Sequence, residues 1–283
     1  MKVRNWVIAL ALLPVFAMAG DMTPEQRKDA MSSLEWHVGP RAEAIAGKAT
    51  LKTPNDKVQF LDEKNSRRFL ELTGNLPDDG NFIVYETEGG WWADFSFDPS
   101  GYVKEGEKID ADALLKTLKE GDGPSNEERK RLGLGELHTE GWYVPPHYDE
   151  KTKRLEWGLK LRDSEGIVLN YTIRLLGRSG VMSATLVSSP ETLDADVTSF
   201  RKVLDGFDYN DGEKYSEFKA GDHVAEYGLA ALITGGAAVI ATKKGFWAAA
   251  ALFLAKMWKL VAVGGVAALA GLKSLFKKKE SSN

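Results

Sequence analysis

Residues 153–187 read KRLEWGLKLR-DSEG-IVLNYTIRLL-GRSG-VMSATLV, and this stretch decides the fold. It contains three apolar-rich runs separated by two four-residue polar loops that contain glycine. This spacing is typical of tight hairpins and predicts a three-stranded antiparallel meander. In the middle run every second residue is large and apolar, so one face should be core because side chains alternate between faces. The predicted core residues of that run are Ile167, Leu169, Tyr171, Ile173 and Leu175.

The sequence on either side of the meander carries further helix and strand patterns. Capping residues and apolar spacing predict helices at 23–36, 62–74, 110–121, 126–132 and 189–206. Short strands are predicted at 43–52, 57–60, 82–85 and 91–97. Strands joined by hairpins and grouped in blocks with helices indicate an α+β domain, in which helices pack on an antiparallel sheet.

The N-terminus has the pattern of a secretory signal peptide. Lys2 and Arg4 form a short positive region, residues 6–16 are apolar, and Ala17-Met18-Ala19 fits a small-residue cleavage site. We therefore expect a signal peptide at 1–19 and an exported domain at 20–222, with an uncleaved N-terminal anchor as the alternative. The expected location is the periplasmic side of a bacterial cell membrane; the surface of a Gram-positive cell is the alternative.

Charge is divided sharply along the chain. Residues 20–223 contain 27 Lys and Arg against 39 Asp and Glu, a net charge of −12, whereas residues 224–283 have a net charge of +6. The acidic part lacks the positive surface that nucleic-acid binding requires, so no nucleic-acid partner is expected. The chain has no cysteine, which excludes disulfides, zinc fingers and cysteine nucleophiles.

Residues 223–283 are interpreted as a C-terminal membrane anchor with a Lys-rich amphipathic helix. The apolar run 227–242 is 16 residues long, and lysines interrupt the longer run 245–272. On a helical wheel these lysines share one arc, which is typical of an amphipathic helix at a membrane surface. The residues expected to anchor the chain are Tyr227, Leu229, Leu232, Ile233, Val239, Ile240, Trp247, Lys256, Lys259, Lys273 and Lys277.

The preferred topology of this tail is one membrane crossing at 226–242 followed by a cationic interfacial helix at 245–276. It places the tail lysines and the C-terminus on the cytoplasmic side, next to the anionic lipids of the inner leaflet. A single span at 245–272 and a two-span hairpin are the alternatives. Glycines in the tail could also permit close helix packing and formation of a homo-oligomer.

Three residues are candidates for hydrolytic chemistry. His147 and Asp149 lie two residues apart, and with Glu156 they could supply a general base and a supporting carboxylate. Their spacing matches no established set of metal ligands, and a histidine in an exposed loop is the commoner explanation. Phosphate-loop and serine-nucleophile motifs are missing. The sequence therefore predicts no metal and no cofactor.

Tryptophans are the other candidates, at positions 36, 91, 92, 142 and 157. Trp91 and Trp92 are adjacent in a predicted strand, so their side chains must point to opposite faces. One of them is either exposed, where an indole could stack on a glycan or peptide, or covered by a helix on a second buried face. Trp142 and Tyr148 are further candidates for a binding surface.

Several motifs give the chain a resemblance to a known family. They are Asp110–Leu115, Gly141-Trp142, Pro146–Asp149, Leu155-Glu156-Trp157, Asn170-Tyr171, Arg174–Met182 and Glu226–Ala231. With these motifs the chain resembles, over 45–277, a family of uncharacterised prokaryotic membrane-anchored proteins grouped as a domain of unknown function. The resemblance implies a signal peptide, an exported domain and a C-terminal anchor, and it brings no catalytic residues or cofactor.

Two classes of function follow from the sequence. The first is a non-enzymatic envelope protein that binds, senses or acts as a scaffold, with a protein or glycan of the envelope as partner. The second is an envelope hydrolase that uses His147 and Asp149, and it requires these side chains to converge in a cleft within hydrogen-bonding distance.

Overall fold

The computed structural model describes residues 22–75 and 79–234. The chain divides into two compact units. The first unit comprises Met1–Val103 and Ala111–Ala225, and the second comprises Lys104–Asp110 and Glu226–Asn283.

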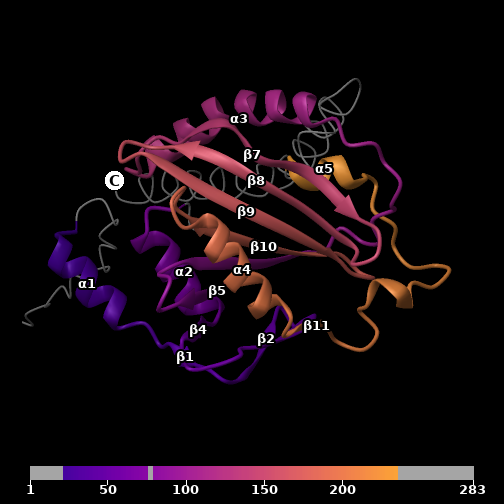
Figure 1. Cartoon of the computed structure of the whole chain (residues 1–283), viewed down its shortest axis with the longest axis horizontal. Coiled ribbons are helices and arrows are strands. Elements are labelled where there is room, and N and C mark those ends of the chain that lie inside the picture. Colours follow the sequence, from indigo (N-terminus) through magenta and orange to yellow (C-terminus); the bar gives the residue numbers. More distant parts are fainter. Residues whose placement is uncertain (1–21, 76–78, 235–283) are drawn as a thin grey trace, which may run out of the picture. The chain divides into compact units, whose positions relative to one another are not determined.

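An eight-stranded antiparallel sheet is the centre of the first unit (Figure 1). Its strand order is β1-β4-β5-β6-β10-β9-β8-β7. The strands are β1 (His37–Val38), β4 (Val58–Leu61), β5 (Asn81–Glu86), β6 (Trp92–Asp98), β7 (His138–Asp149), β8 (Arg154–Arg162), β9 (Ile167–Leu176) and β10 (Val181–Ser188). The predicted meander is confirmed as β8-β9-β10, and β9 pairs with both neighbours along most of its length.

A smaller sheet and four helices complete this unit. The smaller sheet has the order β11-β3-β2, and its strands are β2 (Ala42–Ile45), β3 (Ala49–Lys52) and β11 (Phe207–Tyr209). The helices are α1 (Pro24–Ser32), α2 (Glu63–Leu72), α3 (Ala111–Arg131) and α4 (Leu193–Leu204), with a short 3₁₀ turn, η2 (Tyr215–Glu217). The predicted α+β class is confirmed.

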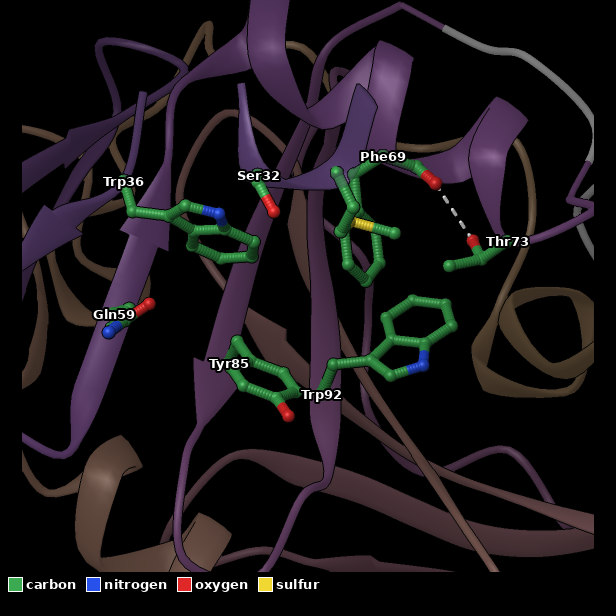
Figure 2. Close-up of a pocket in the computed structure, with 8 residues that line it drawn as sticks. Ser32, Trp36, Gln59, Phe69, Thr73, Tyr85 and Trp92 are labelled. Atoms are coloured by element: carbon green, nitrogen blue, oxygen red, sulfur yellow. Dashed lines mark hydrogen bonds between the residues drawn. The ribbon is translucent and has the colours of Figure 1, made fainter. Parts of the chain in front are cut away.

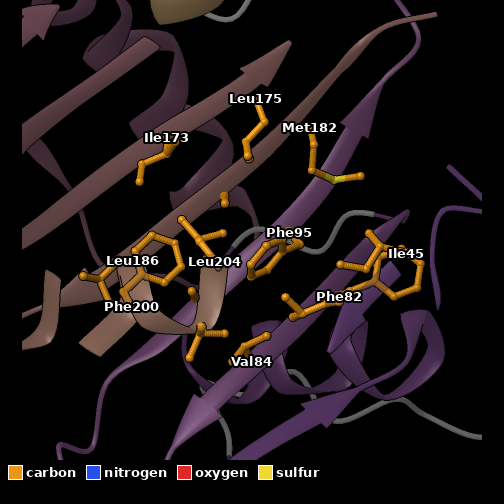
Figure 3. Close-up of a cluster of buried hydrophobic side chains, with 14 of the residues drawn as sticks. Ile45, Phe82, Val84, Phe95, Ile173, Leu175, Met182, Leu186, Phe200 and Leu204 are labelled. Atoms are coloured by element: carbon orange, nitrogen blue, oxygen red, sulfur yellow. The ribbon is translucent and has the colours of Figure 1, made fainter. Parts of the chain in front are cut away.

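The main hydrophobic core lies on one face of the large sheet (Figure 3). Phe200 and Leu204 of α4 pack there with residues from β5, β6, β9 and β10, and Ile45 joins from the smaller sheet. The alternation predicted for β9 is confirmed, since Leu169, Tyr171, Ile173 and Leu175 are buried and Ile167 packs at the edge of the cluster. Burial of each large apolar side chain contributes about 1.5–3 kcal/mol, so this cluster is the main source of stability.

The opposite face of β4, β5 and β6 is covered by α2. Phe69 and Leu70 of α2 pack against Leu61 and Ile83. The helix begins where the sequence predicts, because the side chain of Asp62 accepts a hydrogen bond of 2.9 Å from the backbone N–H of Asn65. These central strands are therefore buried on both faces.

The predicted division of residues 110–132 into two helices is wrong. Gly121, Gly123 and Pro124 are turn signals, yet α3 continues through them as one helix. Side chains from this region bond to β7 and to the residue before it. Asp122 accepts a hydrogen bond from the backbone N–H of Thr139 at 2.7 Å, and the side-chain amide of Asn126 accepts from the N–H of Leu137 and donates to its carbonyl. Packing against β7 thus outweighs the local preference for a break.

Residues 138–149, where the sequence suggested an exposed loop, form the edge strand β7. The strand pairs with β8 and carries three register irregularities along its length. Bulges and prolines such as Pro145 and Pro146 are common on edge strands because they discourage pairing with other chains. They also hide the strand pattern in the sequence.

Residues 210–225, here called the strap, pack against the rest of the first unit. Arg178, in the β9–β10 loop, donates two hydrogen bonds to Asp222 at 2.6 and 2.7 Å. Its backbone N–H also donates to the carbonyl of Glu213 at 2.8 Å. Tyr215 stacks on Tyr102 with a centroid distance of 4.3 Å. The end of the predicted domain at 20–222 is therefore fixed to the rest of the unit by specific contacts.

The second unit contains the short helix α5 (Leu229–Ile233) among its described residues. The backbone N–H of Ala230 donates to the carboxylate of Glu107 at 2.9 Å. Within residues 22–75 and 79–234, no helix combines the length and the apolar character needed to cross a membrane. The predicted span at 226–242 is described only as far as Thr234, and the alternative span at 245–272 lies wholly outside the described residues.

The Arg178–Asp222 pair should make stability depend on pH. The hydrogen bonds from Arg178 lower the pKa of Asp222 to about 2, below the value of about 3.9 expected for an unfolded chain. The pair therefore stabilises the fold at and above about pH 4, and this contribution is lost as the pH falls toward 2. We expect Asp222→Asn to lower the urea midpoint at neutral pH, and the difference from the wild type to shrink between pH 4 and 2.

The matched control for this measurement is Asp56→Asn, which changes an exposed carboxylate and should leave the midpoint nearly unchanged at neutral pH. A loss of stability in Asp222→Asn that stays constant down to pH 2 would show that the charge of Asp222 is not what matters.

Candidate ligand-binding site

The residues proposed for hydrolysis occupy two different environments. His147 and Asp149 are exposed on β7. His147 Nδ1 lies 3.4 Å from the carbonyl oxygen of Pro145, and Asp149 accepts a hydrogen bond of 2.8 Å from the backbone of Lys151. That hydrogen bond lowers the pKa of Asp149. Both interactions are local, and neither residue lines a described pocket.

Glu156 is opposite His147 in the β7–β8 ladder, yet its carboxylate is buried and bonded elsewhere. It accepts hydrogen bonds from the hydroxyl of Tyr171 at 2.7 Å and from Arg201 at 2.6 Å. Burial and the bond to Glu156 raise the pKa of Tyr171 to about 12. This network joins β8, β9 and α4, so it explains the burial of Glu156 without a catalytic role. In the described part of the chain no group of three or more His, Asp or Glu residues could hold a metal ion.

The two adjacent tryptophans point to opposite faces, and both faces are covered. Trp91 is buried in the main core with its ring edge-on to Phe200 at 5.8 Å. Trp92 is half-buried on the other face, where its ring meets Phe69 of α2 at 5.2 Å. Of the two alternatives for this pair, a second face covered by a helix is the one observed. The cover that α2 provides over Trp92 is incomplete.

Trp142 and Tyr148 lie on β7 and are half-buried. The indole N–H of Trp142 donates a hydrogen bond of 3.0 Å to the carbonyl of Ala111, at the start of α3. This bond gives Trp142 a structural role in docking α3 on β7.

A pocket opens beside Trp92 on the face of the sheet covered by α2 (Figure 2). Its volume is about 400 Å³. It is formed by the end of α1, the segment before β1, helix α2 and strands β4, β5 and β6. The lining residues are Met31, Ser32, Trp36, Gln59, Phe69, Thr73, Tyr85 and Trp92. This set is here called the aromatic pocket.

Four rings border the pocket in a continuous series. Trp36 lies 5.7 Å from Tyr85 and 5.9 Å from Phe69, and Phe69 lies 5.2 Å from Trp92, between ring centroids. Figure 2 shows Trp36, Tyr85 and Trp92 arranged around one space with Phe69 beside them. Phe69 is buried and fixed by α2, whereas the other three rings are half-buried. A pocket with aromatic walls of this kind is typical of small-molecule sites.

The polar groups of the aromatic pocket are few and partly engaged. The hydroxyl of Ser32 donates to the carbonyl of Lys28 at 2.9 Å. The hydroxyl of Thr73 donates to the carbonyl of Phe69 at 2.9 Å, the bond drawn in Figure 2. None of the eight lining residues carries a charge. The pocket is therefore suited to a group that needs contact with ring faces more than hydrogen bonds.

Among the residues predicted to anchor the chain, the structure describes only those before position 235. Tyr227 precedes α5, and Leu229, Leu232 and Ile233 lie within it. The others lie outside the described residues, namely Val239, Ile240, Trp247, Lys256, Lys259, Lys273 and Lys277. The anchor stays a prediction from sequence.

The different positions of Trp91 and Trp92 should appear in stability. We expect Trp91→Ala to lower the free energy of unfolding by about 3–5 kcal/mol, because it removes a buried ring from the main core. Trp92→Ala should cost only about 1–2 kcal/mol, because the ring is half-buried and borders a pocket. Urea unfolding of the full-length protein measures both values; equal losses would contradict the assignment of the two faces.

Comparison with known proteins gives a family and distant structural likenesses. No protein among those of curated function matches the chain. The solution structure of cyanobacterial PsbP (CyanoP) from Synechocystis sp. PCC 6803 is similar at 12% sequence identity and a TM-score of 0.36, covering 60% of this chain and 92% of that one. A family profile matches residues 38–266, which confirms the resemblance to a family of uncharacterised proteins. The chain belongs to the family described as Protein of unknown function (DUF2167).

Proposed function

We propose that the protein is a membrane-tethered binding protein of the cell envelope whose ligand places a compact apolar group in the aromatic pocket. The observation that carries this proposal is the pocket itself. Three half-buried aromatic rings, Trp36, Tyr85 and Trp92, line a space of about 400 Å³ that no side chain fills. Partly exposed aromatic side chains around such a space commonly contribute the largest part of a binding free energy.

The location in the envelope is supported by the two ends of the sequence. Residues 1–19 have the pattern of a signal peptide, and the tail combines apolar runs with eight lysines. We propose that the acidic domain faces the extracytoplasmic side, and that the basic tail holds the chain at the membrane through anionic inner-leaflet lipids. Glycines in the tail support a further proposal, that copies of the chain associate through it.

The hydrolase alternative receives no support from the geometry. It needs His147, Asp149 and Glu156 in one cleft, but the first two residues are exposed and the third is bonded to Arg201 and Tyr171. Binding therefore accounts for more of the described residues than catalysis does.

Occupancy of the aromatic pocket can be tested with a small neutral probe, 3,3-dimethylbutan-1-ol. The full-length protein is labelled with 5-fluorotryptophan in a maltoside detergent, and the ¹⁹F resonances of Trp36 and Trp92 are assigned from Trp→Phe variants. We expect these two resonances to shift saturably at millimolar probe concentrations, because both rings border the pocket.

Two variants make this test specific. Ser32→Phe places a ring in the pocket from the end of α1 and should abolish the shifts. Tyr143→Leu removes an exposed ring of β7 that lies outside the pocket, and it should leave the shifts unchanged. The proposal is wrong if no apolar or alkylated probe shifts the two resonances, or if Ser32→Phe leaves the shifts intact.

The proposed orientation can be tested with Ser282→Cys, which is the only cysteine in the resulting chain because the natural sequence has none. In intact cells a membrane-impermeant maleimide should not label this position, whereas permeabilised cells should be labelled. Labelling in intact cells would place the C-terminus outside and contradict the preferred topology.

A further inference from the structure

We propose that the aromatic pocket binds the quaternary ammonium group of a small soluble compound. This inference rests on the proposed function, since it names the class of ligand for the same pocket. It starts from the electronic character of the walls. Aromatic faces carry a negative quadrupole, so a cation within about 6 Å of a ring centroid is attracted, most strongly by indoles.

The rings are arranged so that one cation can contact several of them at the same time. Neighbouring rings in the series Tyr85, Trp36, Phe69 and Trp92 are 5.2–5.9 Å apart. Figure 2 shows three of these rings on different sides of a common space. A compact group placed there can contact two indoles and a phenol at once, and their attractions for a positive charge add.

An anionic ligand is poorly matched to this lining. None of the eight residues is Lys, Arg or His, and the hydroxyl protons of Ser32 and Thr73 are directed at backbone carbonyls. The ring faces would also repel a negative charge. If the ligand carries a charge in this pocket, we therefore expect that charge to be positive.

A bare ammonium group is also poorly matched. It is strongly hydrated and needs acceptors for three N–H donors, whereas the lining contains no carboxylate. A quaternary ammonium group has the same charge and no N–H to satisfy, so it can leave water for an aromatic pocket at a lower cost. Because no lining residue is charged, we expect the pocket to prefer an alkylated cation to the bare ammonium group of a lysine side chain.

Two properties beyond the pocket agree with this ligand. Residues 20–223 have a net charge of −12, and such a domain raises the local concentration of cations at its surface. The volume of about 400 Å³ is near the lower end of the range for small-molecule pockets. We therefore commit to a small soluble compound as the occupant rather than a macromolecule.

The experiment compares three probes on the fluorotryptophan-labelled full-length protein. Choline carries the quaternary ammonium group, 3,3-dimethylbutan-1-ol has the same shape without charge, and ethanolamine carries a bare ammonium. A maltoside detergent is required because choline-headed detergents would occupy the site. We expect choline to bind with a dissociation constant at least about tenfold lower than either analogue, from its saturable shifts of the Trp36 and Trp92 resonances.

A pair of variants at Gln59 tests the sign of the charge directly. Gln59 is half-buried at the pocket wall. Gln59→Glu should tighten choline binding several-fold relative to the neutral alcohol, and Gln59→Lys should weaken it by a similar factor relative to the same alcohol. Tyr143→Leu is the control and should change no affinity.

The possible outcomes separate the two proposals. If the neutral alcohol binds as tightly as choline, or if ethanolamine does, the quaternary ammonium inference is wrong while the pocket remains a binding site. Equal choline affinity in Gln59→Glu and Gln59→Lys would also overturn it. If none of the probes shifts the two resonances, the proposed function fails together with the inference.

Discussion

The structure depends on the burial of both faces of the central strands. Trp91 and Trp92 show this constraint most directly: the first contacts Phe200 of α4 and the second contacts Phe69 of α2. Because successive side chains of a strand point to opposite faces of the sheet, both faces are buried only where a helix or a second sheet packs on each of them. The large sheet provides the framework, α4 and the smaller sheet complete one layer, and α2 completes the other over β4, β5 and β6. The aromatic pocket exists because this second layer stops short of covering Trp92.

Much of the fold could be predicted because local and tertiary preferences agree there. The alternation of β9, the loops on either side of it and the caps at Thr23 and Asp62 all act over a few residues, and all are confirmed. The errors fall where packing outweighs local signals. Helix α3 passes through Gly121 and Pro124 because Asp122 and Asn126 are held by β7. Strand β7 itself was missed because bulges and prolines, which suit an edge strand, remove the two-residue period.

The site could be predicted only in part. The sequence indicates that Trp91 and Trp92 face opposite ways, but it cannot say which face leaves an opening. The aromatic pocket combines Trp36, Phe69 and Tyr85 with Trp92, and packing of α2 on the sheet brings these residues together from three elements and the segment before β1. His147 and Glu156 show the reverse problem. They are neighbours in the strand ladder, yet one is in solvent and the other is bonded to Arg201 and Tyr171. Sequence proximity and even strand pairing do not establish a shared chemical environment.

The strap has a mechanical consequence. At its end, Tyr102 exchanges backbone hydrogen bonds with His223 and Ala225, and nearby Asp222 is held by the two hydrogen bonds from Arg178. A pull applied at Ala225 therefore meets these bonds before it reaches the short strand β11. The fold thus isolates its core from tension at the point where the chain leaves the first unit.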